Sequence, residues 1–404
     1  MHLARLASMF AIGAILMTGC APTGTAPSSA APSASPSSGP TSYDVQVDSK
    51  SQAFNFQADA YFPNVLKAHP GDTIRFKNFD RGVPHTVTFG TMVDTAVASL
   101  EKQPSPAPNA APPPPTPELF KLPRLITRTP PPTAPQAAAQ PCFLASGEPP
   151  ADVKTPCSKD QQTQKDFDGS QSYFNSGWLG QDQTFSLKLA DTIKPGTYKY
   201  ICLLHLDLMT GQLTVVDKSQ PSDTQQQVKA NADKQLNDYV AKLKPEVDAA
   251  SKATADRAQA GVITSNPPSF QATLFAPKEI SVPVGGSVSW TIFGPHTISF
   301  NVPQDAVGIL TKGADGTVST NLKALGPTGG PGQPAPPAPG SPAGPSPTVV
   351  DAGTWDGKGF LSSGLFRPAP PAVFAYKLTF TQAGTYPFRC VIHSDMEGTV
   401  KVGQ

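Results

Sequence analysis

The chain contains the same pattern of residues twice. Residues 71–89 read GDTIRFKNFDRGVPHTVTF, residues 285–300 read GGSVSWTIFGPHTISF, and each stretch has Pro-His-Thr close to its end. Farther along, each copy has Gly-Thr-Tyr followed by a Cys-x2-His motif. Repetition of this kind is typical of a duplicated folding unit. Because 404 residues are enough for two such units, each with its own core, we expect two domains of one fold.

Apolar residues alternate with polar ones in both copies. Ile74 and Phe76 do so in the first copy, and Val288 and Trp290 occupy the matching positions in the second. A period of two indicates strands with one buried face, and the Gly, Pro and Asp residues between these runs indicate turns. The sequence therefore predicts a mainly β chain made of sandwich or barrel domains.

Composition marks the domain boundaries. We place the first domain at residues 43–217 and the second at residues 263–404. Each carries a proline-rich insertion, at about residues 100–165 in the first domain and about 323–350 in the second. Proline cannot donate to a strand ladder, and segments of this composition bury little apolar surface. Both insertions are therefore expected to be largely disordered.

A helical pattern lies between the two domains. Residues 225–261 are rich in Ala, Lys, Gln and Asp and contain no glycine before Gly261. Apolar residues recur there at helical spacing, and Pro245 is expected to break or kink the helix. We therefore expect residues 218–262 to form a helical linker. A spacer that rests on one domain is favoured over a helix that binds a partner.

The N-terminus has the pattern of an export signal. In MHLARLASMFAIGAILMTGC, Arg5 precedes an apolar run that is too short to span a membrane comfortably. The run ends at Met-Thr-Gly-Cys20, which resembles a bacterial lipobox. We predict a lipoprotein signal peptide over residues 1–20, lipidation at Cys20 and a disordered tether over residues 21–42. A plain secretory signal is the alternative. The protein is expected outside the cytoplasm, lipid-anchored to a bacterial membrane in the periplasm or at the cell surface.

The charge balance excludes one class of partner. The chain has 31 basic and 30 acidic residues, a net charge of +1. A polyanion-binding protein normally carries a basic excess, so we expect no nucleic acid partner. The sequence also contains neither Gly-x-Ser-x-Gly nor His-Glu-x-x-His, so it has no motif for hydrolysis.

Each copy contains four residues that bind soft metal ions. The histidine of Pro-His-Thr is followed, much later, by a cysteine at the end of a predicted strand and by a histidine and a methionine in the next loop. The predicted metal ligands are His85, Cys202, His205 and Met209 in the first copy, and His296, Cys390, His393 and Met396 in the second. Two imidazoles, a thiolate and an axial thioether are the ligand set of a blue copper site. Any one of these residues could be an ordinary core residue, but the repeated set of four favours copper.

At these residues the chain resembles the cupredoxins, the family of plastocyanin, amicyanin and auracyanin. The loop from Cys390 to Met396 has the short spacing of amicyanin, and the loop from Cys202 to Met209 is one residue longer. The resemblance covers about residues 43–90, 172–217, 268–302 and 352–403.

The chain departs from the family at one position in each copy. Many cupredoxins have asparagine after the first histidine, and its side chain hydrogen-bonds across the site. Here Thr86 and Thr297 stand at that position. A hydroxyl can partly replace the amide, so we expect the substitution to affect the tuning of the site more than metal binding.

The resemblance implies two cupredoxin-like Greek-key β-sandwich domains, each with one type 1 copper. It also implies a function as an electron carrier between redox proteins of an extracytoplasmic or membrane electron-transfer chain. We expect no enzyme, because catalytic copper sites need further histidines and only His2 and His69 remain beyond the four predicted ligands. Two alternatives stay open: a copper chaperone or storage protein, and a copper reductase whose active site is completed at a subunit interface.

The five cysteines fall into three groups. Cys202 and Cys390 must remain thiolates if they bind copper, and Cys20 is assigned to the lipid. Cys142 and Cys157 are the remaining pair in an oxidising compartment, so we expect a disulfide between them.

Leucines surround the second histidine of the first copy, where a solvated loop would normally be polar. We expect Leu204, Leu206 and Leu208 to form an apolar docking surface for a redox partner. The alternative is that they only exclude water from the metal.

Overall fold

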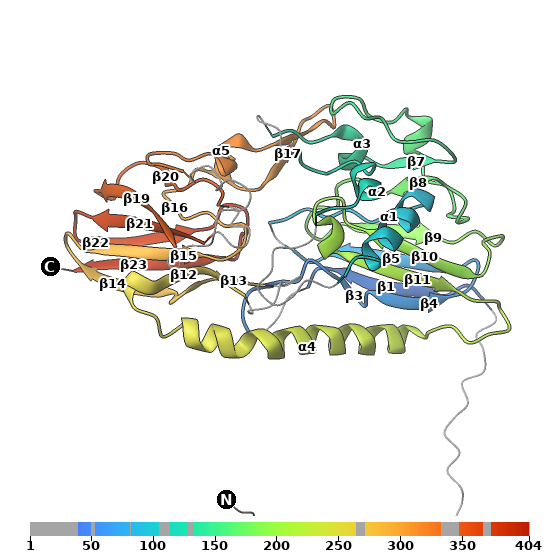
Figure 1. The fold of residues 1–404 in the computed structure, drawn as a ribbon, viewed down its shortest axis with the longest axis horizontal. Coiled ribbons are helices and arrows are strands. Elements are labelled where there is room, and N and C mark those ends of the chain that lie inside the picture. Colours follow the sequence, from blue (N-terminus) through green and yellow to red (C-terminus); the bar gives the residue numbers. More distant parts are fainter. Residues whose placement is uncertain are drawn as a thin grey trace, which may run out of the picture. The chain divides into compact units, whose positions relative to one another are not determined.

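The computed structural model describes residues 39–49, 53–80, 82–104, 114–127, 132–263, 271–332, 347–366 and 373–403 (Figure 1). The predicted signal peptide, Cys20 and most of the predicted tether lie outside the described residues. The rest of the chain belongs to one unit, Ser38–Gln404. Within the described residues, no helix is both long and apolar enough to cross a bilayer.

The first copy folds into two β-sheets. One sheet has the order β3-β1-β5-β9 and contains β1 (Ser42–Val47), β3 (Tyr61–Phe62), β5 (Thr73–Asn78) and β9 (Thr184–Lys188). The other has the order β4-β11-β10-β6-β8-β7 and contains β4 (Val65–Ala68), β6 (Thr88–Phe89), β7 (Cys142–Leu144), β8 (Tyr173–Asn175), β10 (Gly196–Ile201) and β11 (Thr210–Val215).

Aromatic side chains from both sheets meet in the core of the first copy. The ring centroid of Phe76 on β5 lies 5.4 Å from that of Tyr200 on β10 and 6.1 Å from that of Phe89 on β6. All three side chains are fully buried. Each burial contributes about 1.5–3 kcal/mol, with a further gain from edge-to-face ring contacts. Because β10 leads directly into Cys202, this packing also fixes the position of that cysteine.

The second copy also folds into two sheets. One has the order β19-β21-β15-β12-β13-β2 and contains β12 (Ala258–Val262), β13 (Gln271–Ala276), β15 (Ser287–Ile292), β19 (Thr348–Trp355) and β21 (Phe374–Phe380). Its edge strand β2 (Phe56–Gln57) comes from the part of the chain assigned to the first domain and pairs with β13. The other has the order β14-β23-β22-β16-β20 and contains β14 (Glu279–Pro283), β16 (Ser299–Phe300), β20 (Leu361–Ser362), β22 (Gly384–Arg389) and β23 (Glu397–Gly403). A separate hairpin joins β17 (Leu310–Lys312) and β18 (Val318–Thr320).

Strand pairing is repeated between the copies. β1 runs parallel to β5 as β12 does to β15, and β4 runs parallel to β11 as β14 does to β23. The strand before each predicted metal-binding cysteine, β10 or β22, pairs antiparallel with the strand after the loop, β11 or β23. The chain is therefore mainly β, as predicted, and one topology occurs twice.

The predicted linker forms a long helix and then a strand. α4 (Gln225–Ala250) begins with a capping box, in which the side chains of Thr224 and Gln227 satisfy backbone N–H groups of the first turn. The helix contacts β1 and β3 as well as β12 and β13, whereas we expected a spacer that rests on one domain. β12 takes up the end of the predicted linker. Its sequence Ala-Gln-Ala-Gly-Val is made mostly of small residues, which give no strand pattern.

α4 also runs through Pro245, where we expected a break or a kink, and the helix is not broken there. A proline inside a helix costs about 3 kcal/mol. Leu243 and Val247, on either side of it, are buried in an apolar cluster with Phe56 and Phe62. Burial of these side chains offsets the cost of the proline and keeps the helix continuous.

The described parts of the first insertion are folded, contrary to the expected disorder. α1 (Thr91–Glu101) leads into it, and α2 (Pro117–Phe120) and α3 (Gln136–Ala139) lie within it. α2 starts with a capping bond from Leu119 N–H to the side chain of Thr116 and has proline at its first position. Leu119, Leu122 and Leu125 are buried, and they supply the apolar surface that the proline content obscured.

The remaining short helices are η1 (Asp160–Gln162), η2 (Leu206–Leu208), η3 (Ala255–Arg257), η4 (Gln304–Ala306) and α5 (Leu322–Leu325). α5 and the residues up to 332 begin the second proline-rich insertion, whose central part lies outside the described residues. In the first insertion, a disulfide joins Cys142 on β7 to Cys157, the pair predicted from the sequence.

Candidate metal centres

The first candidate site combines loops from two distant places in the chain. His85 lies between β5 and β6, and its backbone exchanges two hydrogen bonds with Leu179. Cys202 directly follows β10, and His205 comes three residues later. The Nδ1 atoms of both imidazoles face the sulfur, at 3.8 Å for His85 and 3.7 Å for His205. His85 and Cys202 are fully buried, whereas the His205 side chain is 14% exposed.

The second candidate site repeats this arrangement. His296 lies between β15 and β16, and its backbone pairs with Phe366. Cys390 directly follows β22, and its Sγ lies 3.5 Å from Nδ1 of His393. The Nδ1 atoms of His296 and His393 are 3.1 Å apart. All three predicted ligands are buried.

A threonine connects the two loops of each site. The backbone N–H of Thr86 donates to Cys202 Sγ at 3.4 Å, and its Oγ1 accepts from Leu203 N–H at 2.8 Å. In the second site, Thr297 N–H donates to Cys390 Sγ at 3.4 Å, and its Oγ1 accepts from the backbone N–H after that cysteine at 2.9 Å. The hydroxyl therefore hydrogen-bonds across each site at the position where many cupredoxins have asparagine.

Each predicted axial methionine is hydrogen-bonded through its backbone to the cysteine of the same loop. Cys202 N–H donates to the backbone oxygen of Met209 at 3.0 Å, and Cys390 N–H donates to that of Met396 at 2.9 Å. Both methionines are fully buried. Each loop therefore closes with its methionine beside its cysteine and out of water.

The spacing of the donor atoms fits a metal ion. In each group, the two imidazole nitrogens and the sulfur lie within 4.8 Å of one another. Bonds of about 2.0 Å to nitrogen and about 2.3 Å to sulfur place trigonal ligand atoms roughly 3.5–3.7 Å apart. The separations of Cys202 Sγ from His85 and His205, and of Cys390 Sγ from His393, are close to this, and the nitrogen pair of the second site needs to open only slightly. Two imidazoles, a thiolate and a nearby thioether match the donor set of type 1 copper.

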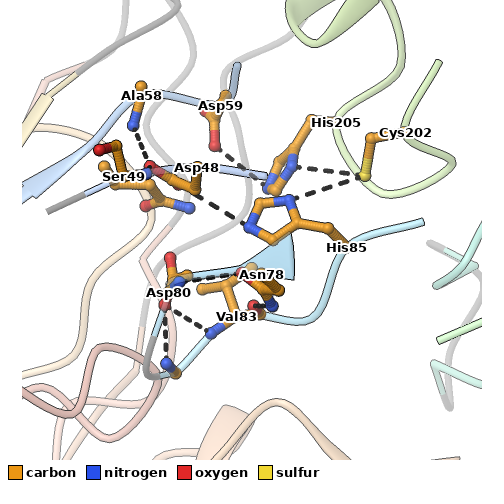
Figure 2. Close-up of polar contacts among 12 residues, drawn as sticks. Asp48, Ser49, Ala58, Asp59, Asn78, Asp80, Val83, His85, Cys202 and His205 are labelled. Atoms are coloured by element: carbon orange, nitrogen blue, oxygen red, sulfur yellow. Dashed lines mark hydrogen bonds and ion pairs between the residues drawn. The ribbon is translucent and has the colours of Figure 1, made fainter. Parts of the chain in front are cut away.

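Carboxylates lie behind both histidines of the first site (Figure 2). Asp48 Oδ2 is 3.8 Å from Nε2 of His85, and Asp59 Oδ1 is 3.3 Å from Nε2 of His205. Asp48 is fully buried, and neither of these two oxygens has a hydrogen-bond partner among the described residues. Asp80 lies with Asp48 and His85 in a second group of possible ligand atoms.

Backbone amides hold two of these carboxylates in place. Oδ1 of Asp48 accepts from Ser49 N–H at 2.6 Å and from Ala58 N–H at 3.0 Å. Oδ1 of Asp80 accepts from the N–H groups of Gly82 and Val83. These contacts leave the other oxygen of Asp48 directed at the imidazole of His85 (Figure 2).

The second site has an amide in the equivalent place. His296 Nε2 lies 3.1 Å from Oε1 of Gln271, whose Nε2 donates to Gln57 Oε1 at 3.2 Å. His393 Nε2 is buried and has no hydrogen-bond partner in the part of the chain that the structure describes. Gly261 packs against the ring of His296, where an added Cβ would approach Nε2 to 2.3 Å, and its φ of +79° also favours glycine.

The electrostatic environments of the two thiols differ. Burial raises the pKa of Cys202, but a hydrogen bond with His205 and the charge of that ring outweigh it and lower the pKa below its usual value. Burial raises the pKa of Cys390 above its usual value. Before metal binds, the thiol of the first site therefore loses its proton more readily than the thiol of the second site.

Burial keeps three of the histidines neutral. It lowers the pKa of His85 and takes the pKa of His296 to about 3. It also holds the pKa of His393 well below its usual value, with His296 and His205 acting in the same direction. A neutral imidazole is the form that binds a metal ion, so these side chains are ready to ligate near neutral pH.

The leucines of the first loop differ in exposure. Leu206 is 8% exposed and packs in the core, and Leu204 is only partly exposed. Leu208 is 48% exposed. Of the three leucines predicted to dock a partner, Leu208 alone keeps the open position that docking requires.

Sequence reasoning missed the residues behind the histidines. Asp48, Asp59, Asp80 and Gln271 lie in strands and loops far along the chain from the cysteines, and no repeated motif marks them. The sequence signal that could have found them is weak: acidic residues gather upstream of the first histidine in the first copy. His69 lies at a turn, and its ring contacts Gln220 and Ser222.

Comparison with solved structures finds blue copper proteins. Auracyanin A from Chloroflexus aurantiacus is matched at 17% identity over 44% of this chain and 100% of that chain, with a TM-score of 0.22. A methionine-to-glutamine mutant of amicyanin with Cu(I) is matched at 13% identity over 43% of this chain and 82% of that chain, with a TM-score of 0.19. An oxidized proline-to-alanine mutant of amicyanin is matched at 23% identity, over 31% of this chain and 70% of that chain, with a TM-score of 0.16.

No family model matches the chain. No curated protein matches it either. At these TM-scores the likeness to solved structures carries no argument about the whole chain. The functional interpretation therefore rests on the donor atoms and on the repeated strand pairing.

Proposed function

We propose that the protein is an electron carrier with two type 1 copper sites, one in each copy of the fold. The observation that carries the proposal is the repeated set of two imidazole nitrogens and one cysteine sulfur within 4.8 Å. His85, Cys202 and His205 would hold the first copper, and Met209 would be its axial ligand. His296, Cys390 and His393 would hold the second, with Met396 axial. Bound copper would supply the one-electron chemistry, by cycling between Cu(II) and Cu(I).

The protein residues limit how much the site changes during electron transfer. The threonine bonds tie the loop with the first histidine to the loop with the cysteine. Buried strands hold both loops, and all the predicted ligands except the partly exposed His205 are buried. A site with fixed ligands and little water reorganises little when its charge changes, which favours rapid transfer between proteins. Nothing in this function requires a substrate to be transformed, so we propose a carrier and not an enzyme.

The proposal includes location and partners. The lipobox-like sequence supports export and lipid attachment at Cys20, outside the cytoplasm. The partners would be redox proteins of an extracytoplasmic or membrane electron-transfer chain. A copper chaperone or storage protein would need ligands that release metal readily, which the burial of these donor atoms disfavours.

Redox cycling of the copper-loaded protein tests the proposal. Ascorbate should bleach the colour, ferricyanide should restore it, and two electrons per chain should be exchanged without loss of copper. A chelator challenge should remove copper slowly. Rapid transfer of copper to the chelator would favour the chaperone, and turnover with nitrite or oxygen would favour the reductase.

A further inference from the structure

The two candidate sites differ in the groups behind their histidines, and burial, with the nearby carboxyls of Asp80 and Asp59, raises the pKa of Asp48 well above its usual value. In the first site both Nε2 atoms face a carboxylate, that of Asp48 for His85 and that of Asp59 for His205. In the second site His296 faces the neutral amide of Gln271. Nε2 of His393 has no hydrogen-bond partner among the described residues.

This difference changes the relative stability of the oxidised and reduced states of a bound metal ion. When Nδ1 binds the metal, Nε2 carries the proton and is directed at the outer group. A carboxylate there stabilises the higher charge of the oxidised metal more than the lower charge of the reduced metal. A neutral amide does so much less. Even at an effective dielectric constant of about 20, one charge several Å from the metal shifts such an equilibrium more than tenfold.

We propose that Asp59, with Asp48 behind the other histidine, makes the first site the electron donor and leaves the second site as the acceptor. Electrons would then enter the chain at the first site and leave from the second. In the internal step, one electron passes from Cu(I) in the first site, which becomes Cu(II), to Cu(II) in the second, which becomes Cu(I). No bond to the protein breaks in this step. The inference rests on the proposed function, because it requires type 1 copper in both sites.

Single-site variants allow each potential to be measured separately. Cys390→Ser should leave copper only in the first site, and Cys202→Ser should leave it only in the second. Spectroelectrochemical titration of each should give a lower midpoint potential for the first site. We expect a difference equivalent to at least tenfold in electron distribution, which is about 59 mV for one electron. In the unaltered protein, one equivalent of reductant should then reduce mainly the second site.

Asparagine substitutions connect the difference to the carboxylates. Asp59→Asn should shift the reduction equilibrium of the first site at least about threefold toward Cu(I). Asp48→Asn should shift it in the same direction by less, because burial raises the pKa of Asp48, and the double variant should shift it further. Asparagine retains the Oδ1 acceptor that holds Asp48 to Ser49 and Ala58, so the loop should stay folded. Both substitutions should shift the potential of the second site much less when they are made in the Cys202→Ser background.

Asp72→Asn is the matched control. Asp72 is a buried aspartate of the same copy, 2% exposed, but its partners are Thr41, Tyr43 and His69. Its substitution should leave both potentials unchanged. A purely structural role of Asp48 would alter stability and the optical spectrum without a selective rise in the first potential.

The possible outcomes distinguish failure of this inference from failure of the proposed electron-carrier function. Equal potentials, a reversed order, or an unchanged potential in both asparagine variants would overturn the inference while leaving the electron carrier intact. If one asparagine variant fails to fold, the other decides. Failure of the single-site variants to bind copper or to show thiolate-to-copper colour would instead overturn the proposed function.

Discussion

At the residue scale, a threonine hydroxyl links the two loops of each candidate metal site. Thr86 Oγ1 accepts the N–H of Leu203, directly after the predicted ligand cysteine, and both residues are fully buried. Thr86→Val should leave that N–H without a partner and lower the free energy of unfolding by about 1–3 kcal/mol. Urea unfolding of the metal-free protein measures this. Thr86→Ser, which retains the hydroxyl, is the control and should lose much less. An equal loss in both variants would show that packing of the methyl group dominates.

One exposed residue remains a candidate for docking. Leu208 is 48% exposed and lies three residues after His205. Because weak electron-transfer encounters use small apolar contacts, Leu208→Lys should slow electron exchange with the physiological partner several-fold while copper content and colour persist. Val349→Lys, made at a similarly exposed apolar residue on β19, is the matched control. If both variants exchange electrons at the rate of the unaltered protein, Leu208 does not dock the partner.

At the scale of elements, α1 carries a carboxylate whose ionisation opposes folding. Burial raises the pKa of Asp94 to about 6, against a usual 3.8, although its Oδ1 accepts the backbone N–H of Lys199 at 2.7 Å. Between these two values the folded chain binds the proton more tightly than the unfolded chain. Stability should therefore fall as pH rises from about 4 to about 6.

Substitution of Asp94 tests the direction of this pH dependence of stability. Asp94→Asn keeps the oxygen acceptor and removes the charge, so its stability relative to the unaltered chain should be greater at pH 7 than at pH 4. We expect a difference of about 1–2 kcal/mol, reduced because the carboxylate is partly exposed. Denaturant unfolding of metal-free protein at both pH values measures it. A gap that does not change with pH, or one larger at pH 4, would contradict the assignment.

The disulfide provides another prediction at this scale. Cys142 and Cys157 close a loop with a sequence separation of 15. In the chain-entropy model, removing the bond in Cys142→Ser/Cys157→Ser should cost about 3 kcal/mol of unfolding free energy. Reduction of the unaltered metal-free protein should cause a similar loss, and the double variant should not respond to the reductant. Unchanged stability after reduction would mean that the bond does not support the fold.

At the scale of the whole molecule, the sequence predicted the features that occur in both copies and missed those that occur in only one. The ligand set and the strand pattern occur twice, so chance agreement was improbable, and the structure brings His85, Cys202 and His205 together. Asp48 and Asp59 could not be predicted, because their role depends on strand positions brought together only by folding. Local rules also failed where tertiary packing decided the structure. Pro245 lies inside a helix whose buried face holds it, and β12 is made mostly of small residues.

The most direct test of the account is the copper content of the purified chain, measured together with its optical and EPR spectra. We predict two coppers per chain, both with strong thiolate-to-copper absorption and type 1 EPR signals. Cys202→Ser and Cys390→Ser should each retain one copper and its share of the colour, and the double variant should retain neither. A chain that binds no copper would contradict the assignment of these two sites. So would a chain that keeps its colour after both cysteines are replaced.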